Sequence, residues 1–147
     1  MTITTLPAEA VVRLLELQRH PEGGWYRETW RHDGGQQGRG AGTAIYYLLA
    51  ENEVSSWHRV DATEIWHWYA GAPLRLDQSA SAGTVSSSIL GPDLVGGEKP
   101  QIIVPSRVWQ SARSLGAWTL VGCTVSPAFV FSGFEMAPAG WQPISTE

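Results

Sequence analysis

The sequence predicts an all-β domain, built as a sandwich or barrel, with one short α-helix at its N-terminal end. After residue 24, short apolar or alternating segments are separated by Gly, Pro, Ser and Asp at roughly 8–12-residue intervals, which is typical of such folds. No strand pattern alternates with a helical one, so a parallel βαβ sheet is excluded. With 147 residues, 43% of them hydrophobic and 16% charged, the chain is expected to form a single domain over residues 1–147.

The one helical pattern lies over residues 7–19. Four residues follow the spacing of a single helical face: Val11, Leu14, Leu15 and Gln18. Pro7 is tolerated in a first helical turn, and the helical period does not return for long after the segment HPEGG. We therefore expect a short amphipathic helix followed by a barrel over about residues 24–136.

The barrel region divides into short strands and one glycine-rich loop. Ten segments are predicted as strands: 24–31, 43–49, 55–60, 64–71, 73–79, 84–90, 100–105, 108–113, 118–125 and 129–136. The stretch from Gly34 to Gly42 is expected to be a mobile hairpin loop that carries no chemistry.

Charge and apolar content exclude several classes of partner. A net charge of −4, from 14 acidic and 10 basic residues without a basic run, gives no field that attracts nucleic acid or anionic lipid. Apolar runs such as 44–50 are far shorter than the roughly 20 residues of a membrane span, and the N-terminus has no signal-peptide pattern. We expect a cytoplasmic protein with neither partner. Its single cysteine, Cys123, is expected to be a buried, inert thiol.

The best candidates for chemistry are His58 and Glu64. His58 lies in one predicted strand and Glu64 opens the next, and adjacent antiparallel strands would bring the two side chains together. A carboxylate beside an imidazole fixes its tautomer and raises its pKa toward neutrality. The pattern therefore predicts an acid/base pair, with His58 as general base and Glu64 as its orienting partner. A hydrogen-bonded pair without catalysis is the alternative.

These residues resemble a known family. His58, a short turn, Glu64, six further residues and Gly71 resemble the first motif of the cupins, and Pro105 with Gln110 resembles a degenerate second motif. Five ordered segments, HPEGGWYRETWR, TAIYYLL, SWHRVDATEIWHWYAG, PQIIVPSRVWQSA and LVGCTVSPAFVFSGFE, are similar to the DUF985 (Cupin_5) group over most of the chain. The resemblance implies a double-stranded β-helix, the cupin jelly-roll barrel. It implies little about function, because the biochemical role of that group is largely unassigned.

The departures from the metal-binding cupins predict a site without a cofactor. Those proteins present two histidines and a glutamate in the first motif and a further histidine in the second. Here Val60 or Ser56 takes the place of one histidine, and Gln110 takes the place of another. A transition metal generally takes three or more N, O or S ligands from the protein. No metal is therefore expected; a divalent ion, if present, would be held by His58, Glu64 and Gln110.

Aromatic residues near these motifs predict a pocket for a flat ring. The expected substrate-binding residues are Tyr46, Trp57, Trp66, Trp68, Trp109 and Gln110. Of the eight tryptophans, Trp118 and Trp141 are assigned to packing, while contacts from Tyr26 or Arg27 stay open. His67 alternates with its tryptophan neighbours, so it points to the opposite face, where a structural or dimer-interface role is expected.

The leading functional hypothesis is a metal-independent epimerase, isomerase or dehydratase acting on a sugar- or nucleoside-like small molecule. One alternative is a non-catalytic binding module for a purine- or sugar-like ligand. Another is a metal-dependent cupin dioxygenase. A homodimer formed through edge strands is expected in each case, because small jelly rolls leave edges to protect.

Overall fold

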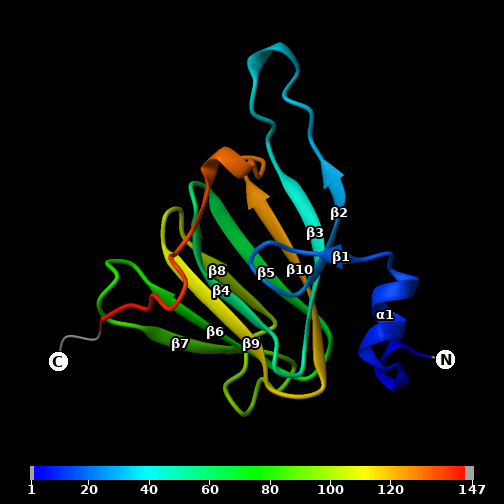
Figure 1. The fold of residues 1–147 in the computed structure, drawn as a ribbon. Helices are drawn as coiled ribbons and strands as arrows, with labels where there is room; N and C mark the ends of the chain where they lie inside the picture. Colours follow the sequence, from blue (N-terminus) through cyan, green and yellow to red (C-terminus); the bar gives the residue numbers. More distant parts are fainter. Residues whose placement is uncertain (1, 145–147) are drawn as a thin grey trace.

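The computed structural model describes residues 2–144 and folds them into two facing antiparallel sheets (Figure 1). The larger sheet contains, in spatial order, β1 (Gln18–Arg19), β2 (Trp25–Arg31), β3 (Thr43–Ala50), β10 (Trp118–Ser126), β5 (Thr63–Gly71) and β8 (Gln101–Val104). The smaller sheet contains β11 (Phe134–Met136), β4 (Val54–Val60), β9 (Trp109–Ser114), β6 (Leu74–Ser79) and β7 (Ser86–Leu90). The predicted all-β barrel is confirmed. Within 2–144, no helix is long and apolar enough to cross a membrane.

The one α-helix within residues 2–144, α1 (Ala8–Leu14), is shorter than the pattern over residues 7–19 suggests. Glu16 adopts a left-handed φ of 56°, which ends the helix. Gln18, expected on the helical face, instead pairs with Tyr26 in the hairpin of β1 and β2. Because the chain must turn back to join the sheet, tertiary pairing overrides the helical period here.

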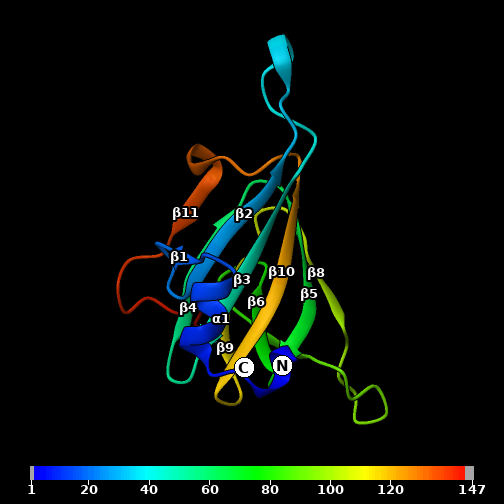
Figure 2. The same ribbon diagram turned by 90° about the vertical axis from the view of Figure 1, so that its right-hand side faces the viewer.

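The helix packs on the outer surface of the larger sheet, over β3 and β10 (Figure 2). Val11 is buried against Leu48, Leu120 and Trp118, and the indole N–H of Trp118 donates to the carbonyl of Leu6 at 3.0 Å. Leu14, expected on the same face, is largely exposed. The helix therefore covers the sheet from outside and leaves the barrel interior free for other side chains.

One end of the barrel interior is filled by apolar side chains. Leu74, Leu76 and Leu90 are fully buried between the sheets, together with Val104 and Val121. Successive residues of a strand point to opposite faces, so the alternate apolar positions of β6 meet those of β8 and β10. This end is a closed hydrophobic core.

The other end of the interior is polar. Buried polar side chains there include those of Glu22, Ser55, His58, Glu64 and Gln110. They come from the turn before β2 and from strands β4, β5 and β9. Burial of so many polar groups is costly unless they are paired, so this end is the candidate for function.

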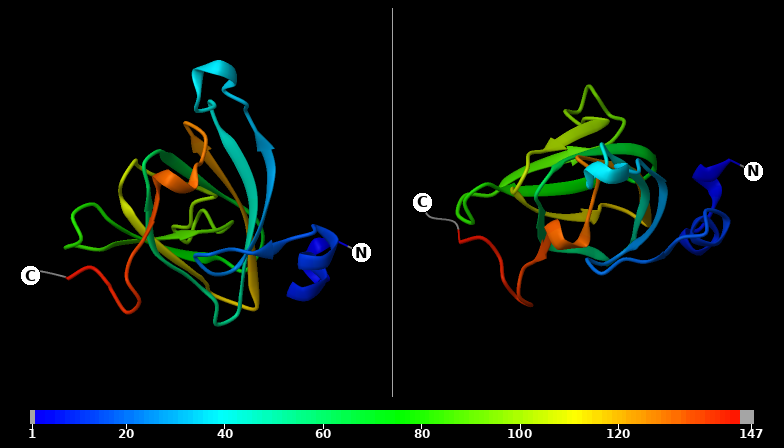
Figure 3. Two further views of the ribbon diagram at one scale, coloured as in Figure 1. Left: turned by 45° about the horizontal axis from the view of Figure 1, so that its top comes forward. Right: turned by 90° about the horizontal axis from the view of Figure 1, so that it is seen from above.

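The turn between β4 and β5 and the segment after β10 meet above the polar end, beside the long β2–β3 connection (Figure 3). Within that connection Gly35–Gln37 form a 3₁₀ turn, and Arg39 binds both carboxylate oxygens of Asp61 at 2.7 and 2.9 Å. Arg39 also donates to the carbonyl of Ala128 at 2.7 Å, which ties the loop to the segment after β10. In that segment a 3₁₀ turn (Phe131–Gly133) precedes β11, so the strand predicted over 129–136 forms only at its end.

Candidate functional site

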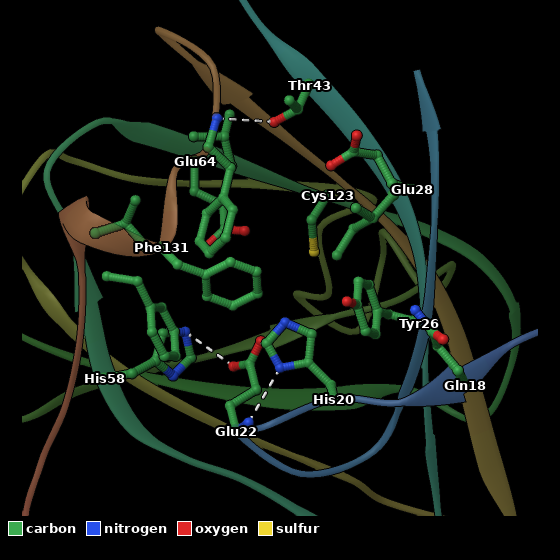
Figure 4. A pocket seen from close by; sticks show the side chains of 15 residues that line it. Gln18, His20, Glu22, Tyr26, Glu28, Thr43, His58, Glu64, Cys123 and Phe131 are labelled. Atoms are coloured by element: carbon green, nitrogen blue, oxygen red, sulfur yellow. Dashed lines mark hydrogen bonds and ion pairs between the residues drawn. The ribbon is translucent and has the colours of Figure 1, made fainter. Parts of the chain in front are cut away.

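A cavity of about 280 Å³ opens at the polar end of the barrel (Figure 4). The N-terminal turn, both sheets and the segment around the last 3₁₀ turn contribute to its wall. Its polar lining comes from Gln18, His20, Glu22, Tyr26, Glu28, Thr43, His58 and Glu64. Its apolar lining comes from Ile45, Val60, Cys123, Val125, Phe129, Phe131 and Phe134.

His58 points inward from β4 and is almost fully buried. Its Nε2 lies 2.9 Å from Glu22 Oε2, and its Nδ1 lies 2.7 Å from the carbonyl oxygen of Ser56. Burial by itself lowers the pKa of His58, but the charge of Glu22 and the hydrogen bond to it outweigh burial and raise that pKa to about 9. His58 is therefore an imidazolium at neutral pH, with both N–H groups already donated.

This arrangement differs from the expected pair of His58 and Glu64. The hydrogen-bonded partner of His58 is Glu22, while Glu64 acts on His58 only through its charge. Strands β4 and β5 belong to different sheets, so consecutive strands of the chain are not neighbours here. The short turn between them crosses from one sheet to the other, as it does in a jelly roll.

Glu22 reaches the barrel interior because of the glycines that follow it. Gly23 and Gly24 adopt φ values of 108° and 77°, and a Cβ on Gly23 would lie 2.2 Å from the carbonyl oxygen of Val54. Ser55 donates its hydroxyl to Glu22, whose own carbonyl accepts the N–H of Ser56 at 2.8 Å. From the sequence alone, no functional role is assigned to Glu22 or to the segment HPEGG. The sequence feature that could have identified Glu22 is a carboxylate placed directly before two glycines.

The carboxyl group of Glu64 is part of a buried relay. The indole N–H of Trp66 donates to Gln110 Oε1 at 2.8 Å, and Gln110 Nε2 donates to Glu64 Oε1 at 2.7 Å. An indole can only donate, so it fixes the orientation of the Gln110 amide, and Glu64 Oε1 must accept. Oε2 has no hydrogen-bond partner among the described residues and is not among their fully buried atoms. The proton of Glu64 is therefore carried on Oε2, the oxygen left to the cavity.

The environment of Glu64 brings the pKa of its carboxyl group close to neutral pH. Burial, assisted by the charge of Glu22, raises the pKa of Glu64 to about 7, although His58 and Gln110 act in the opposite direction. The side chain is more than nine-tenths buried. Near pH 7 both protonation states of Glu64 are populated, as a group that accepts and returns protons requires.

His20 supplies a second functional group. Its Nδ1 accepts the backbone N–H of Glu22 at 3.0 Å, and burial lowers its pKa despite the opposing charge of Glu22, so the ring is neutral with its hydrogen on Nε2. The 3.3 Å approach of Nδ1 to Glu22 Oε1 is consequently not an ion pair. The ring packs edge-on against Tyr26, with 4.5 Å between centroids. Its Nε2 has no hydrogen-bond partner in the described part of the chain.

The tryptophans expected around the site do not line this cavity. Trp57 and Trp109 lie on the outer face of the smaller sheet, where both pack against Trp141 with centroids 6.1 and 4.7 Å apart. Neighbouring residues in a strand face opposite ways, so Trp57 cannot share the inward face of His58. Trp66 is buried in the core behind the relay.

The remaining predicted contacts also lie elsewhere. Tyr46 faces outward, 6.4 Å from the ring of Tyr69, and Trp68 donates to the carbonyl of Ala72 at 3.2 Å. Gln110 is buried behind Glu64 and does not itself line the cavity. Aromatic surface comes instead from Tyr26 and from Phe129, Phe131 and Phe134. Of the predicted site residues, His58 and Glu64 line the cavity; Tyr26, whose contact was left open, lines it as well, whereas Arg27 does not.

Two further sequence expectations concern single side chains. Cys123 is buried, burial raises the pKa of its thiol, and its sulfur faces the cavity (Figure 4). His67 lies on the outer face, 3.1 Å from Thr124 Oγ1 and stacked on Tyr69. The burial of Cys123 and the outward direction of His67 agree with the sequence expectations, while the inertness of the thiol and the dimer-interface role of His67 stay predictions.

The polar residues do not fit a metal ion. Within residues 2–144, no group of three or more His, Cys, Asp and Glu side chains has the geometry to hold one. The two nitrogens of His58 point at Glu22 and at the Ser56 carbonyl, and Gln110 occupies one oxygen of Glu64. Three unengaged donors therefore do not converge on one point, as a transition metal would require.

The fold and the site together define the class of protein. Two facing antiparallel sheets with a polar pocket inside one end of the barrel are the architecture of the double-stranded β-helix. The family described as Cupin_5, cupin superfamily (DUF985), matches residues 9–137. The chain belongs to this family.

Solved structures support the assignment. A protein from Shewanella oneidensis superposes with a TM-score of 0.86 at 36% identity, covering 90% of this chain and 85% of that one. A hypothetical protein from Leishmania major gives 0.81 at 28% identity, covering 90% and 88%. Oxalate decarboxylase from Bacillus subtilis gives 0.62 at 14% identity, covering 80% of this chain and 29% of that one, which shows a common fold alone. No curated protein matches the chain.

Proposed function

We propose that the protein is a metal-independent enzyme that moves a proton on a small sugar- or nucleoside-like ring, as an epimerase, isomerase or dehydratase does. The observation that carries the proposal is Glu64. Its pKa is raised to about 7, one oxygen is held by Gln110, and the other is left to a cavity. An acid/base group poised near the working pH is what such proton transfer needs.

The chemistry requires no co-reactant. Glu64 Oε2 takes a proton from a carbon next to a carbonyl group, and the electron pair of that C–H bond forms the C=C bond of an enolate. The Nε2–H of His20 hydrogen-bonds the oxygen that gains charge. Return of the proton from Glu64 to the former carbonyl carbon, while the proton of the adjacent hydroxyl group passes to the former carbonyl oxygen, gives an isomer. An epimer forms when solvent instead protonates the opposite face of the enolate and Glu64 releases its proton to solvent. Departure of a neighbouring hydroxyl group as water gives a dehydrated product instead.

In this proposal the role of base moves from His58 to Glu64. His58 has no free nitrogen, because Glu22 and Ser56 accept both of its N–H groups. The pair of His58 and Glu22 instead sets the electrostatics of the site. The charge of Glu22 assists in raising the pKa of Glu64, and the charge of His58 limits that rise.

The size and wall of the cavity support a single ring as the substrate. A volume of about 280 Å³ lies just below the ~300–1,000 Å³ range of small-ligand pockets. Phe129, Phe131 and Phe134 give one side an apolar aromatic surface, on which a sugar or base ring can pack. His20 and Glu64 are the polar groups available to orient that ring.

Proton exchange with solvent tests the proposal even when the product is not known. Aldoses, ketoses and keto-sugars, free and nucleotide-linked, are incubated with the protein in deuterated buffer, and loss of a ring C–H signal is followed by NMR. We expect exchange with at least one sugar, and a rate about 100-fold or more lower for Glu64→Gln. Glu135→Gln removes an exposed carboxylate paired with Arg59 outside the cavity, and it should leave the rate unchanged.

The aromatic wall also favours a second candidate, a non-catalytic module that binds a purine- or sugar-like ligand. It is distinguished by ligand-detected NMR on the same panel, extended with nucleosides. Binding without exchange by any bound compound would contradict the enzyme and support the module. Exchange that persists in Glu64→Gln would contradict the assigned base.

A further inference from the structure

We infer that the pocket selects uncharged ligands and excludes anions, so that its substrate carries no phosphate or carboxylate group. The inference rests on the proposed function in taking this cavity as the ligand site. It deepens that function by naming the class of ring that enters. Free sugars, nucleosides and nucleobases belong to the class, whereas sugar phosphates, sugar acids and nucleotides do not.

The charged groups that line the cavity are mainly acidic. Three carboxyl groups face it, from Glu22, Glu28 and Glu64. Among the described residues that line it, the one cation is His58, whose charge is already neutralised by Glu22 at 2.9 Å. None of the described lining residues is a lysine or arginine.

Arg31 and Arg39, which lie beside the mouth, already donate their hydrogen bonds to protein groups. Arg31 binds both oxygens of Glu28 at 2.8 Å and donates its remaining terminal nitrogen to the carbonyl of Phe129, also at 2.8 Å. Arg39 is held by Asp61 and by the carbonyl of Ala128. Phosphate and carboxylate recognition needs unengaged arginine or lysine donors, or a free helix N-terminus. Neither Arg31 nor Arg39 therefore has a guanidinium left for a ligand, and no described residue that lines the cavity is an arginine or a lysine.

An anion that entered would therefore lie beside the carboxyl group of Glu64 without an available cation, because His58 and Arg31 are already paired with Glu22 and Glu28. A buried charge without a partner is strongly unfavourable, and a like charge nearby adds to that cost. An uncharged ring meets no such cost. Its hydroxyl and carbonyl groups can accept from His20 Nε2 and exchange hydrogen bonds with Glu64 Oε2, while its faces pack on the phenylalanines.

Alkylation of Cys123 measures this selectivity whether or not the substrate is known. Cys123 is the one cysteine of the chain, and its sulfur faces the cavity, so a reagent must enter to react (Figure 4). Iodoacetamide and iodoacetate have nearly the same shape, but only the second is an anion. Their rates with the folded protein at low salt are followed by mass spectrometry and divided by their rates with 2-mercaptoethanol.

We expect the normalised rate of iodoacetamide to exceed that of iodoacetate about tenfold, because a like charge acts strongly in a partly buried site. Phe131→Ala removes an exposed ring at the mouth and should accelerate both reagents, which establishes entry through the cavity. Glu28→Gln should lower the ratio about threefold. Glu135→Gln makes the same change in net charge outside the cavity and should not alter it.

Three outcomes would overturn the inference: equal normalised rates, faster reaction with iodoacetate, and no acceleration by Phe131→Ala. The first two leave the proposed enzyme intact, since a proton-transfer enzyme can also act on an anion. Retained selectivity without hydrogen exchange on any sugar would leave the inference standing and remove the enzyme. The two readouts therefore fail independently.

Discussion

The two ends of the barrel interior are both buried, but they are stabilised differently. At the closed end Leu74, Leu76 and Leu90 are fully buried against other apolar side chains. At the open end His58 is 1% exposed and Glu64 is 8% exposed, yet both are ionisable. Dispersion and the hydrophobic effect hold the first end, whereas the second depends on pairs of groups that compensate one another.

This contrast indicates where the fold carries chemistry. Apolar packing has no dependence on pH between 5 and 9, so mutations at the closed end should act equally across that range. The open end has a pKa near 9 on His58 and one near 7 on Glu64, and its stability must change with pH. Four mutations separate the two ends.

Glu22→Gln should have the largest effect, a loss of about 3–5 kcal/mol in the free energy of unfolding, because it leaves the buried charge of His58 without its partner. The comparison is made by urea unfolding at pH 6. A histidine pKa raised from 6.5 to about 9 adds stability that is fully present below 6.5 and disappears as the pH rises through 9. Glu28→Gln, at a partly exposed pair with Arg31, should cost less than ~1 kcal/mol. Similar losses in the two variants would contradict the assigned role of Glu22.

Leu76→Ala should remove about 3 kcal/mol, because a fully buried leucine leaves a cavity behind. Urea unfolding at pH 5, 7 and 9 checks the prediction, and the loss should be the same at each pH. The rate of hydrogen exchange on the substrate and the ratio of the two alkylation rates at Cys123 should not change. A loss that varies strongly with pH would mean that the two ends are coupled.

Glu64→Gln should stabilise the protein by roughly 2–3 kcal/mol above pH 7 and have little effect below pH 4.5. The pKa of this carboxyl is raised from 4.5 to about 7, so the folded wild type loses stability as the pH rises across that interval. The glutamine still accepts from Gln110, and this preserves the relay. Thermal unfolding across pH 4–9 makes the measurement. A variant that is less stable than wild type at pH 8 would show that Glu64 has a structural role.

Arg39→Ala should have the smallest effect, about 1 kcal/mol, because its pair with Asp61 is partly exposed. Its clearest sign should be faster amide hydrogen exchange in residues 34–42 and around Ala128, whose carbonyl loses a donor. Exchange at the closed end serves as the internal reference. Unchanged exchange in the loop would contradict the anchoring role of Arg39.

The strand pattern and the family motifs predict most of the fold. Each of the ten predicted strands overlaps a strand of the structure, because alternation and turn residues are local signals. The site is less predictable. His58 and Glu64 are found, but the partner of His58 comes from a turn before the barrel and depends on the left-handed backbone of Gly23 and Gly24. Sequence spacing carries no information on such a long-range contact.

The tryptophans show the opposite error, in which residues predicted for the site lie elsewhere in the structure. Abundance near a motif suggested a ligand platform, but Trp57 and Trp109 lie outside the barrel and pack against Trp141. Strand alternation already placed Trp57 opposite His58, so this part could be predicted from the sequence. The wall formed by Phe129, Phe131 and Phe134 could not, since its segment follows the barrel in a 3₁₀ turn. The expected homodimer and cytoplasmic location stay predictions.

The relay from Trp66 through Gln110 to Glu64 gives the pocket an optical reporter. The indole of Trp66 is buried in the apolar core and lines no part of the cavity, yet its N–H is two hydrogen bonds from the carboxyl group. A change in the charge of Glu64 alters the polarisation of the Gln110 amide and hence the electric field at the indole. Protonation or ligand binding in the pocket should therefore shift the emission of one tryptophan that the ligand never touches.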